Sequence, residues 1–201
     1  MTFRSEPGVE YITVPAVGSQ LRLYPQAFVH QAGPWFHALR AEIPWTTEYY
    51  LMFGKQRAAP RLISWHGDAD AVYTYSGLRH APKSWTPALL QIKSQIEALL
   101  QEQFNSVLLN LYRHGQDSMG WHADNEPELG PQPVIASLSL GATRLFKIRQ
   151  QQTRQVLDLH LTTGSVLLMQ GDFQQHWQHC VPKTKRVHEE RINLTFRKIL
   201  S

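Results

Sequence analysis

Residues 191–199 read RINLTFRKI, and this stretch decides the class of fold. Side chains on a β-strand alternate between two faces, so Ile192, Leu194 and Phe196 share one face. The opposite face carries four polar side chains, Arg191, Asn193, Thr195 and Arg197. Such a strand either turns its polar face to water or lines the interior of a barrel. In the second case the two arginines could clamp a small dicarboxylate by paired, charge-assisted hydrogen bonds.

Other short runs of strand-forming residues precede this stretch. After Asn105 they read SVLLNLY, VIASLSL, TRLFKIR, RQVLDLHL and SVLLMQ, separated by segments rich in Gly, Pro, Asn and Asp. Strands spaced in this way predict a sandwich, barrel or jelly roll. We therefore expect a mainly β fold with flanking helices of the α+β class, the helices packed outside the strands.

Two earlier segments have the periodicity of helices. Apolar residues recur at roughly helical spacing over residues 28–43, where Pro34 starts or kinks the run. In the second segment, Thr86 can cap a helix with Pro87 at its first position, and an apolar stripe follows. The pattern predicts helices over residues 28–43 and 86–100.

The composition suits one intracellular domain. The 201 residues are 42% hydrophobic, enough to fill a sizeable core, and no repeat or flexible linker divides them. A single cysteine, Cys180, excludes an internal disulfide framework and any Cys-rich zinc module. No stretch looks like a signal peptide or a membrane span, so we expect a soluble protein of the cytoplasm, or of the nucleus in a eukaryote.

The charge balance is mildly basic. Lys and Arg number 20 against 16 Asp and Glu, a formal net charge of +4. This excess suits a polyanionic partner without identifying one.

A second polar stretch, GWHADNEPELG at residues 120–130, contains a candidate metal site. If the chain is extended there, His122 and Asp124 lie on one side and can point at one ion; otherwise the stretch is a polar loop. A third ligand could come from QQHWQHCVP, as His176 or His179. Two histidines and one carboxylate leave about three octahedral positions open, which suits non-haem Fe(II) oxygenases.

One further pair of polar residues precedes that stretch. In LLNLY, Asn110 and Tyr112 project from the same face of a strand and offer an amide and a phenol. They either belong to a site or pack with satisfied hydrogen bonds.

In this order, NLY, HADNE, HCVP and RINLTFR resemble the AlkB family of Fe(II)- and 2-oxoglutarate-dependent dioxygenases, above all its duplex-DNA repair branch. The resemblance covers about Leu51 to Leu200. It implies a double-stranded β-helix, or jelly-roll, core over residues 105–200. It also implies Fe(II) held by His122, Asp124 and His179, with His179 preferred to His176 because it directly precedes the CVP turn.

The same resemblance implies a pocket for 2-oxoglutarate, the co-substrate. Its two arginines would bind the carboxylates and four neighbours would complete it: Arg191, Arg197, Asn110, Tyr112, Asn193 and Thr195. The implied activity is oxidative demethylation of alkylated bases in DNA, such as 1-methyladenine and 3-methylcytosine. Succinate, CO2 and formaldehyde would be released.

Residues 51–85 resemble the nucleotide-recognition region of that family, behind an N-terminal extension and helix at 1–50. Tyr73 and Tyr75 could stack on a flipped base and donate a hydrogen bond to it, or form an ordinary surface hairpin. Met52, Phe53 and Gly54 could form an apolar wedge on a tight turn, although Phe53 could equally be a core residue. Just beyond the iron motif, Asn125 and Glu126 are expected to face the base edge.

Two basic groups flank these features and could contact phosphates or lie in solvent: Lys55, Arg57 and Arg61, then Lys183, Lys185 and Arg186. The expected partner is alkylated DNA bound by a monomer; double-stranded DNA is expected first, and single-stranded DNA also fits. Three other functions fit parts of the pattern. They are the same chemistry on RNA or protein, a non-catalytic nucleic-acid binding module, and a zinc hydrolase, which two arginines on the facing strand disfavour.

Overall fold

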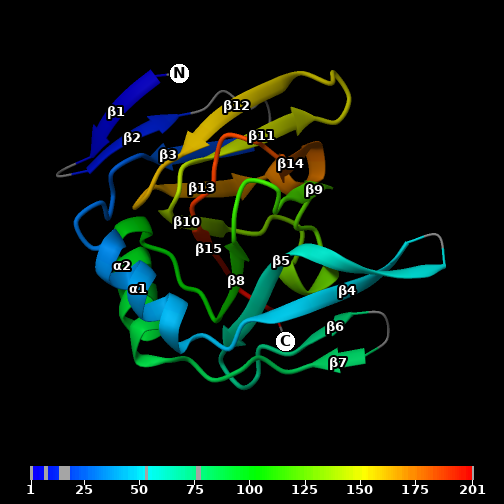
Figure 1. The fold of residues 1–201 in the computed structure, drawn as a ribbon. Coiled ribbons are helices and arrows are strands. Elements are labelled where there is room, and N and C mark those ends of the chain that lie inside the picture. The colour runs from blue at the N-terminus through cyan, green and yellow to red at the C-terminus, as the bar shows by residue number, and fades with distance from the viewer. Residues whose placement is uncertain (1, 7–8, 14–18, 53, 76–77, 201) are drawn as a thin grey trace.

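Two antiparallel sheets pack face to face in the computed structural model, and helices cover the outer face of the larger sheet (Figure 1). The structure describes residues 2–6, 9–13, 19–52, 54–75 and 78–200. Within these ranges the backbone alone is described for residues 2–6, 9–13, 19, 51–52, 73–75 and 78–80.

The larger sheet joins strands from both ends of the chain. In spatial order its strands are β1 (Thr2–Glu6), β2 (Val9–Thr13), β3 (Ser19–Tyr24), β13 (Val166–Gly171), β10 (Ile135–Gly141), β15 (Arg191–Arg197), β8 (Ser106–Tyr112), β5 (Lys55–Gly67) and β4 (Thr46–Met52). β15 is therefore central in the sheet, with β10 on one side and β8 on the other.

The smaller sheet lies over the middle of the larger one. Its strands, in spatial order, are β12 (Val156–Leu161), β11 (Arg144–Gln150), β14 (Trp177–Val181) and β9 (Met119–His122). The remaining short elements are β6 (Tyr73–Tyr75), β7 (Leu78–His80), the 3-10 turn η1 (Pro127–Leu129) and the single-turn helix α3 (Phe173–His176). β4 and β5 form a long hairpin that projects from the body beside the β6–β7 hairpin (Figure 1).

Both predicted long helices are present. α2 (Pro87–Leu100) begins as its sequence predicts, because the Thr86 hydroxyl accepts a hydrogen bond from the Leu89 N–H at 3.2 Å. α1 (Ala32–Glu42) begins four residues later than predicted, with Pro34 in its first turn, where the ring costs no hydrogen bond. Both helices bury apolar side chains against the larger sheet.

The central strand β15 resolves the alternative that its sequence left open. Ile192, Leu194 and Phe196 are fully buried against the helices. Its polar face is also buried, since Arg191 is 1% exposed and Asn193 and Thr195 are each 8% exposed. That face looks into the space between the two sheets, because the apolar face is taken up by the helical layer.

The architecture confirms the predicted fold class, a mainly β jelly roll with flanking helices. Six of its strands coincide with the runs read from the sequence, namely β8, β10, β11, β12, β13 and β15. Among the strands after Asn105, β9 and β14 were not predicted, because each is four or five residues long and lacks an alternating apolar pattern; β1 to β5 were not predicted as strands either. Within the described residues, no helix is long and apolar enough to cross a membrane.

Candidate active site

Three side chains with metal-binding atoms converge between the sheets. His122 ends β9 and lies opposite His179 of β14 in the strand register. The ligand atoms of His122, Asp124 and His179 all lie within 4.8 Å of one another. His176 ends α3 and is not part of this group, so the structure favours His179 as the second histidine.

The two imidazoles are oriented differently. The Nδ1 atom of His122 lies 2.8 Å from the Gly120 carbonyl, which leaves Nε2 facing the Asp124 carboxylate at 3.7 Å. His179 stacks on Phe146 with ring centroids 5.3 Å apart, and its Nδ1 is buried with no hydrogen-bond partner among the described residues. Each histidine therefore has a nitrogen that no hydrogen bond occupies.

Asp124 reaches the group by a route that differs from the prediction. The sequence predicted one extended segment that contains both His122 and Asp124. In the structure β9 ends at His122, and Asp124 lies in the loop beyond it. Long-range contacts hold Asp124 in place. The Arg197 guanidinium donates to its carboxylate at 2.8 Å, and its backbone N–H donates to Gln174 Oε1 at 3.0 Å.

The two buried members of this group, Asp124 and His179, are deprotonated near neutral pH. Burial alone would raise the pKa of the Asp124 carboxyl, but the Arg197 guanidinium and the two imidazoles hold it well below its usual range. Burial lowers the pKa of His179 to about 3, and the neighbouring His122 contributes to the same shift. A metal ion can therefore bind this group without displacing a proton from either residue.

The polar face of β15 forms a buried pocket wall beside His122, Asp124 and His179, which are called the triad below. One Arg191 nitrogen, Nη2, donates to Ser139 Oγ at 2.9 Å and to Asn193 Oδ1 at 2.6 Å. The other two, Nε and Nη1, are buried and have no hydrogen-bond partner among the described residues. Burial lowers the Arg191 pKa to about 10, so the group still carries its charge at neutral pH.

The remaining predicted pocket residues line the same wall. Tyr112 lies opposite Arg191 in the strand register, and the Arg191 guanidinium carbon is 5.2 Å from its ring centroid. Asn110 lies opposite Asn193, whose amide donates to Thr195 Oγ1 at 2.9 Å. The structure thus brings all six predicted pocket residues to one buried face; their roles stay predictions.

Arg61 corrects one expectation drawn from the basic residues near the β4–β5 hairpin. Its position beside Lys55 and Arg57 predicts a phosphate contact, but only 8% of it is exposed. Its Nε donates to Asn110 Oδ1 at 2.7 Å and its Nη2 to Glu48 at 3.0 Å. Arg61 points inward because position 61 lies on the core-facing side of β5, and sequence position alone did not reveal this.

The predicted substrate residues are described unevenly. Phe53 lies outside the described residues, while Met52, Tyr73 and Tyr75 are placed by backbone only, in β4 and β6. Gly54 forms the turn between β4 and β5 with a φ of 71°, a conformation that suits glycine.

Beyond the triad, the two predicted base-facing residues are placed differently. Asn125 is exposed, whereas Glu126 has a buried carboxylate oxygen, Oε2, with no partner among the described residues. Glu126 therefore offers an acceptor at the edge of the site that a ligand could satisfy.

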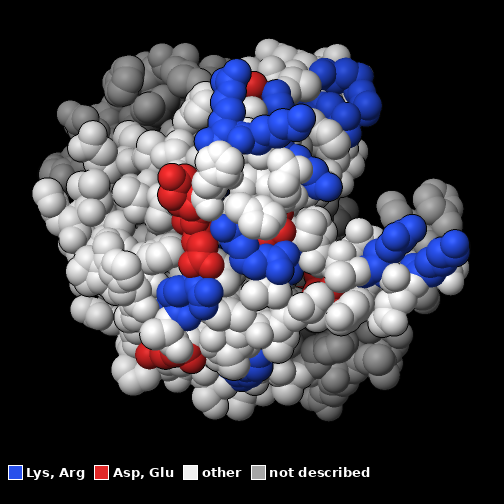
Figure 2. Space-filling model, viewed as in Figure 1, with Lys and Arg blue, Asp and Glu red and all other residues white. Residues whose placement is uncertain are grey.

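The two predicted basic groups are exposed, apart from Arg61. Lys55 and Arg57 are exposed near the end of the β4–β5 arm, where Figure 2 shows basic side chains at the right. Lys183, Lys185 and Arg186 lie in the loop after β14, and all three are exposed.

The basic loop, residues 183–186, is held to the segment around Gly115 by backbone hydrogen bonds. The Thr184 N–H donates to the Gly115 carbonyl at 2.8 Å, and the Gly115 N–H donates to the Val187 carbonyl at 2.8 Å. The buried Arg144 guanidinium also donates to the Pro182 carbonyl at 2.8 Å. These bonds fix where the loop presents its charges.

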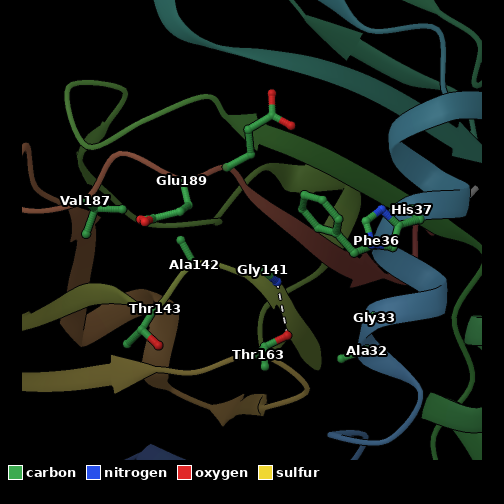
Figure 3. Close-up of a pocket in the computed structure, with 11 residues that line it drawn as sticks. Ala32, Gly33, Phe36, His37, Gly141, Ala142, Thr143, Thr163, Val187 and Glu189 are labelled. Carbon is green, nitrogen blue, oxygen red and sulfur yellow. Dashed lines mark hydrogen bonds between the residues drawn. The ribbon is translucent and has the colours of Figure 1, made fainter.

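A groove of about 720 Å³ lies elsewhere, between α1 and the segment that leads into β15 (Figure 3). Phe36 and Gly141 line it where they pack closely together, and Glu189 and Glu190 also line it. None of the three metal-binding side chains lines it, and neither does Arg191. It is separate from the candidate active site.

Comparison with known proteins agrees with this arrangement. A family model described as the 2OG-Fe(II) oxygenase superfamily matches residues 20–197. "Alpha-ketoglutarate-dependent dioxygenase alkB homolog 3" of Homo sapiens is 37% identical over 204 residues, which cover 96% of this chain and 71% of that protein. The chain belongs to the AlkB family of 2OG-Fe(II) oxygenases. Fe(II) and 2-oxoglutarate are thus the metal and co-substrate that the family implies.

Other AlkB relatives match over shorter parts of their length. The Bos taurus alkB homolog 3 is 41% identical over 174 residues, which cover 82% of this chain and 60% of that protein. "DNA oxidative demethylase ALKBH2" of Homo sapiens is 42% identical over 157 residues, which cover 74% of this chain and 60% of that protein. A solved structure, OsALKBH1, shares the fold at a TM-score of 0.64 and 18% identity, covering 94% of this chain and 99% of that one.

The residues of this AlkB chain fit both groups. Two imidazoles and a carboxylate are a donor set that Fe(II) accepts, and the described residues offer no hydrogen-bond partner to the buried Nδ1 of His179. Either unpartnered nitrogen of Arg191 offers a buried, charged donor to a carboxylate of 2-oxoglutarate. Sequence reasoning missed Gln174 and Ser139, because a lone buried Gln or Ser has no spacing that distinguishes it from other polar residues.

Proposed function

We propose that this chain oxidatively demethylates alkylated bases in DNA, such as 1-methyladenine and 3-methylcytosine. The observation that supports this most strongly is the convergence of His122, Asp124 and His179 beside the buried, half-partnered Arg191. The names of the AlkB relatives, which include a DNA oxidative demethylase, supply the substrate class.

In the proposed site His122, Asp124 and His179 hold the iron. Fe(II), with dioxygen and 2-oxoglutarate, supplies the oxidation of a methyl group bound to a base nitrogen, and formaldehyde is released. Arg191 binds the carboxylate of 2-oxoglutarate that is farther from the metal, assisted by Tyr112. Arg197 is proposed to bind the other carboxylate of 2-oxoglutarate. It also donates a hydrogen bond to Asp124 and so orients that ligand.

The other pocket residues orient these groups. Asn193 accepts hydrogen bonds from Ser137 and Arg191 through one oxygen, which fixes the guanidinium plane. Asn110 is held by Arg61 from the hairpin strand β5. The stack of Phe146 on His179 and the buried walls exclude water from the metal end.

The substrate base is proposed to enter from the side of the two hairpins. Tyr73 and Tyr75 would contact the base, Met52, Phe53 and Gly54 would fill the space it leaves, and Asn125 and Glu126 would face its edge. The exposed Lys55 and Arg57 on the arm, and the basic loop at 183–186, suit the phosphates of a duplex. Duplex DNA is therefore the preferred substrate that we propose.

We further propose that residues 1–201 act as one domain and as a monomer. Strands β3 and β15 come from opposite ends of the chain and share the larger sheet, which supports a single domain. A DNA substrate would place the protein with the DNA, in the cytoplasm of a bacterium or in the nucleus of a eukaryote.

The test is turnover of methylated oligonucleotides with Fe(II) and 2-oxoglutarate, measured as released formaldehyde. Double-stranded DNA, single-stranded DNA, RNA and a methylated peptide are compared at equal concentration. Asp124→Asn is expected to abolish turnover, whereas the matched control Asp158→Asn, an exposed carboxylate paired with Lys147, is expected to retain it. Turnover on RNA alone, or on no DNA, would refute the proposed substrate.

A further inference from the structure

A buried amide beside the triad has no role in the proposed chemistry described above. Gln174 lies in α3, the single turn that joins β13 to β14, and only 1% of it is exposed. Its Oε1 accepts the hydrogen bond from the Asp124 N–H at 3.0 Å. A backbone N–H can only donate, so the atom it meets must be the amide oxygen rather than the amide nitrogen.

This contact takes the place of a hydrogen bond between strands. Because β9 ends at His122, no neighbouring strand accepts a hydrogen bond from the Asp124 N–H. Leaving such a buried donor unpaired costs about 1–3 kcal/mol. On its other side the Gln174 amide places Nε2 at 3.7 Å from Met169 Sδ, a weak acceptor. The bond to Asp124 is therefore the stronger of these two contacts.

Gln174 lies five residues before His179, and both are buried. Phe173 and Trp177 flank Gln174 and stack with an angle of 3° between their rings, and both are almost fully buried. The Phe173 ring lies 6.3 Å from that of His179. A displacement of Asp124 relative to this segment would change its separation from His179.

We infer that Gln174 is a positioning residue that sets the separation of Asp124 and His179 and thereby the metal affinity. The inference rests on the proposed iron ligands. It differs from a purely structural role, in which Gln174 would only fill space and satisfy a backbone donor. Outer contacts that orient metal ligands typically change metal affinity about 10- to 100-fold when removed.

The experiment measures the dissociation constant of Mn(II), a redox-stable substitute for Fe(II), by electron paramagnetic resonance of the free ion. Gln174→Met keeps the volume but loses the acceptor, and it is expected to weaken Mn(II) binding about 10- to 100-fold. Gln174→Glu keeps an acceptor and is expected to bind Mn(II) within about threefold of the wild type. Gln174→Ala, which cannot overpack the site, replaces Gln174→Met if that variant does not fold.

A matched control separates positioning from general stability. Gln170 lies four residues earlier in β13, and its amide donates to Glu102 at 3.0 Å, away from the triad. Gln170→Met is expected to bind Mn(II) like the wild type, and thermal unfolding is recorded for every variant. Wild-type affinity in Gln174→Met, or equal loss in Gln170→Met or Gln174→Glu, would overturn the inference.

Asp124→Ala and His179→Ala test separately whether these residues are metal ligands. Each is expected to lose Mn(II) binding if the ligands are as proposed. If they retain it, the proposed metal site is wrong. If they lose it while Gln174→Met binds normally, only the positioning role fails.

Discussion

Arg191 gives the sharpest test of the co-substrate pocket. Its Nε and Nη1 are buried without partners among the described residues, so a bound carboxylate would gain a charge-assisted hydrogen bond from one of them. Such a bond is worth about 1.5–3 kcal/mol. We expect Arg191→Met to weaken 2-oxoglutarate binding by about 1.5–3 kcal/mol, or roughly one to two powers of ten.

The assay uses Mn(II)-loaded protein without oxygen, and measures the stabilisation of thermal unfolding by increasing 2-oxoglutarate. A second ligand, 2-oxopentanoate, keeps the five-carbon chain but has a methyl group where 2-oxoglutarate has its distal carboxylate. The wild type is expected to prefer 2-oxoglutarate strongly, and Arg191→Met is expected to bind both ligands alike. The variant should fold, because a buried guanidinium with only neutral partners is costly to keep.

Arg149→Met is the matched control for this experiment. The Arg149 guanidinium lies 4.2 Å from the Trp121 ring centroid, on the outer side of the smaller sheet, so its removal should leave the co-substrate preference unchanged. The reasoning would be refuted if Arg191→Met bound 2-oxoglutarate within about threefold of the wild type, or still rejected 2-oxopentanoate.

Two other predictions concern DNA binding and pH. Replacing Lys183, Lys185 and Arg186 with Gln is expected to lower the slope of log affinity against log salt for methylated duplex, measured by fluorescence anisotropy, by about 0.9 for each phosphate that these side chains neutralise. An unchanged slope would show that the basic loop touches no phosphate. For His66, burial lowers the pKa, while Nδ1 donates to the Ser84 carbonyl at 2.7 Å and Nε2 accepts from Ser64 Oγ at 3.1 Å. Because the unfolded chain binds the proton first, this contribution to stability is present above a pH of about 6.5 and is lost below it, by at most about 1.4 kcal/mol per pH unit. In urea unfolding, His66→Gln is expected to reduce the change in the free energy of unfolding between about pH 7.5 and about pH 5.5. An equal loss of stability over this range in the wild type and the variant would contradict this.

Local pattern predicted six of the strands, both long helices and the class of fold, but not β1 to β5. Alternation along β15 predicted which residues share a face, and the cap and proline at Thr86 and Pro87 predicted where α2 begins. These features depend on residues close together in the chain. The short strand β9 could not be predicted in this way, because its four residues hold too little pattern to separate a strand from a loop.

Long-range contacts decided the details of the candidate site. Asp124 was expected on the same strand as His122, but Arg197 and Gln174, which are 73 and 50 residues away in the chain, hold it instead. Arg61 was expected at a phosphate and proved to bond Asn110. Neither contact has a local sequence signal, since each depends on which strands become neighbours.

The sequence by itself determined the residue types and their order: two histidines, a carboxylate and a strand with two arginines on its polar face. It also determined that the arginines share a face, because strand geometry repeats every two residues. Only the tertiary structure decided that this face is buried, that His179 rather than His176 meets His122, and that three ligand atoms lie within 4.8 Å. Those outcomes depend on the packing of one sheet on the other, which no short stretch of chain specifies alone.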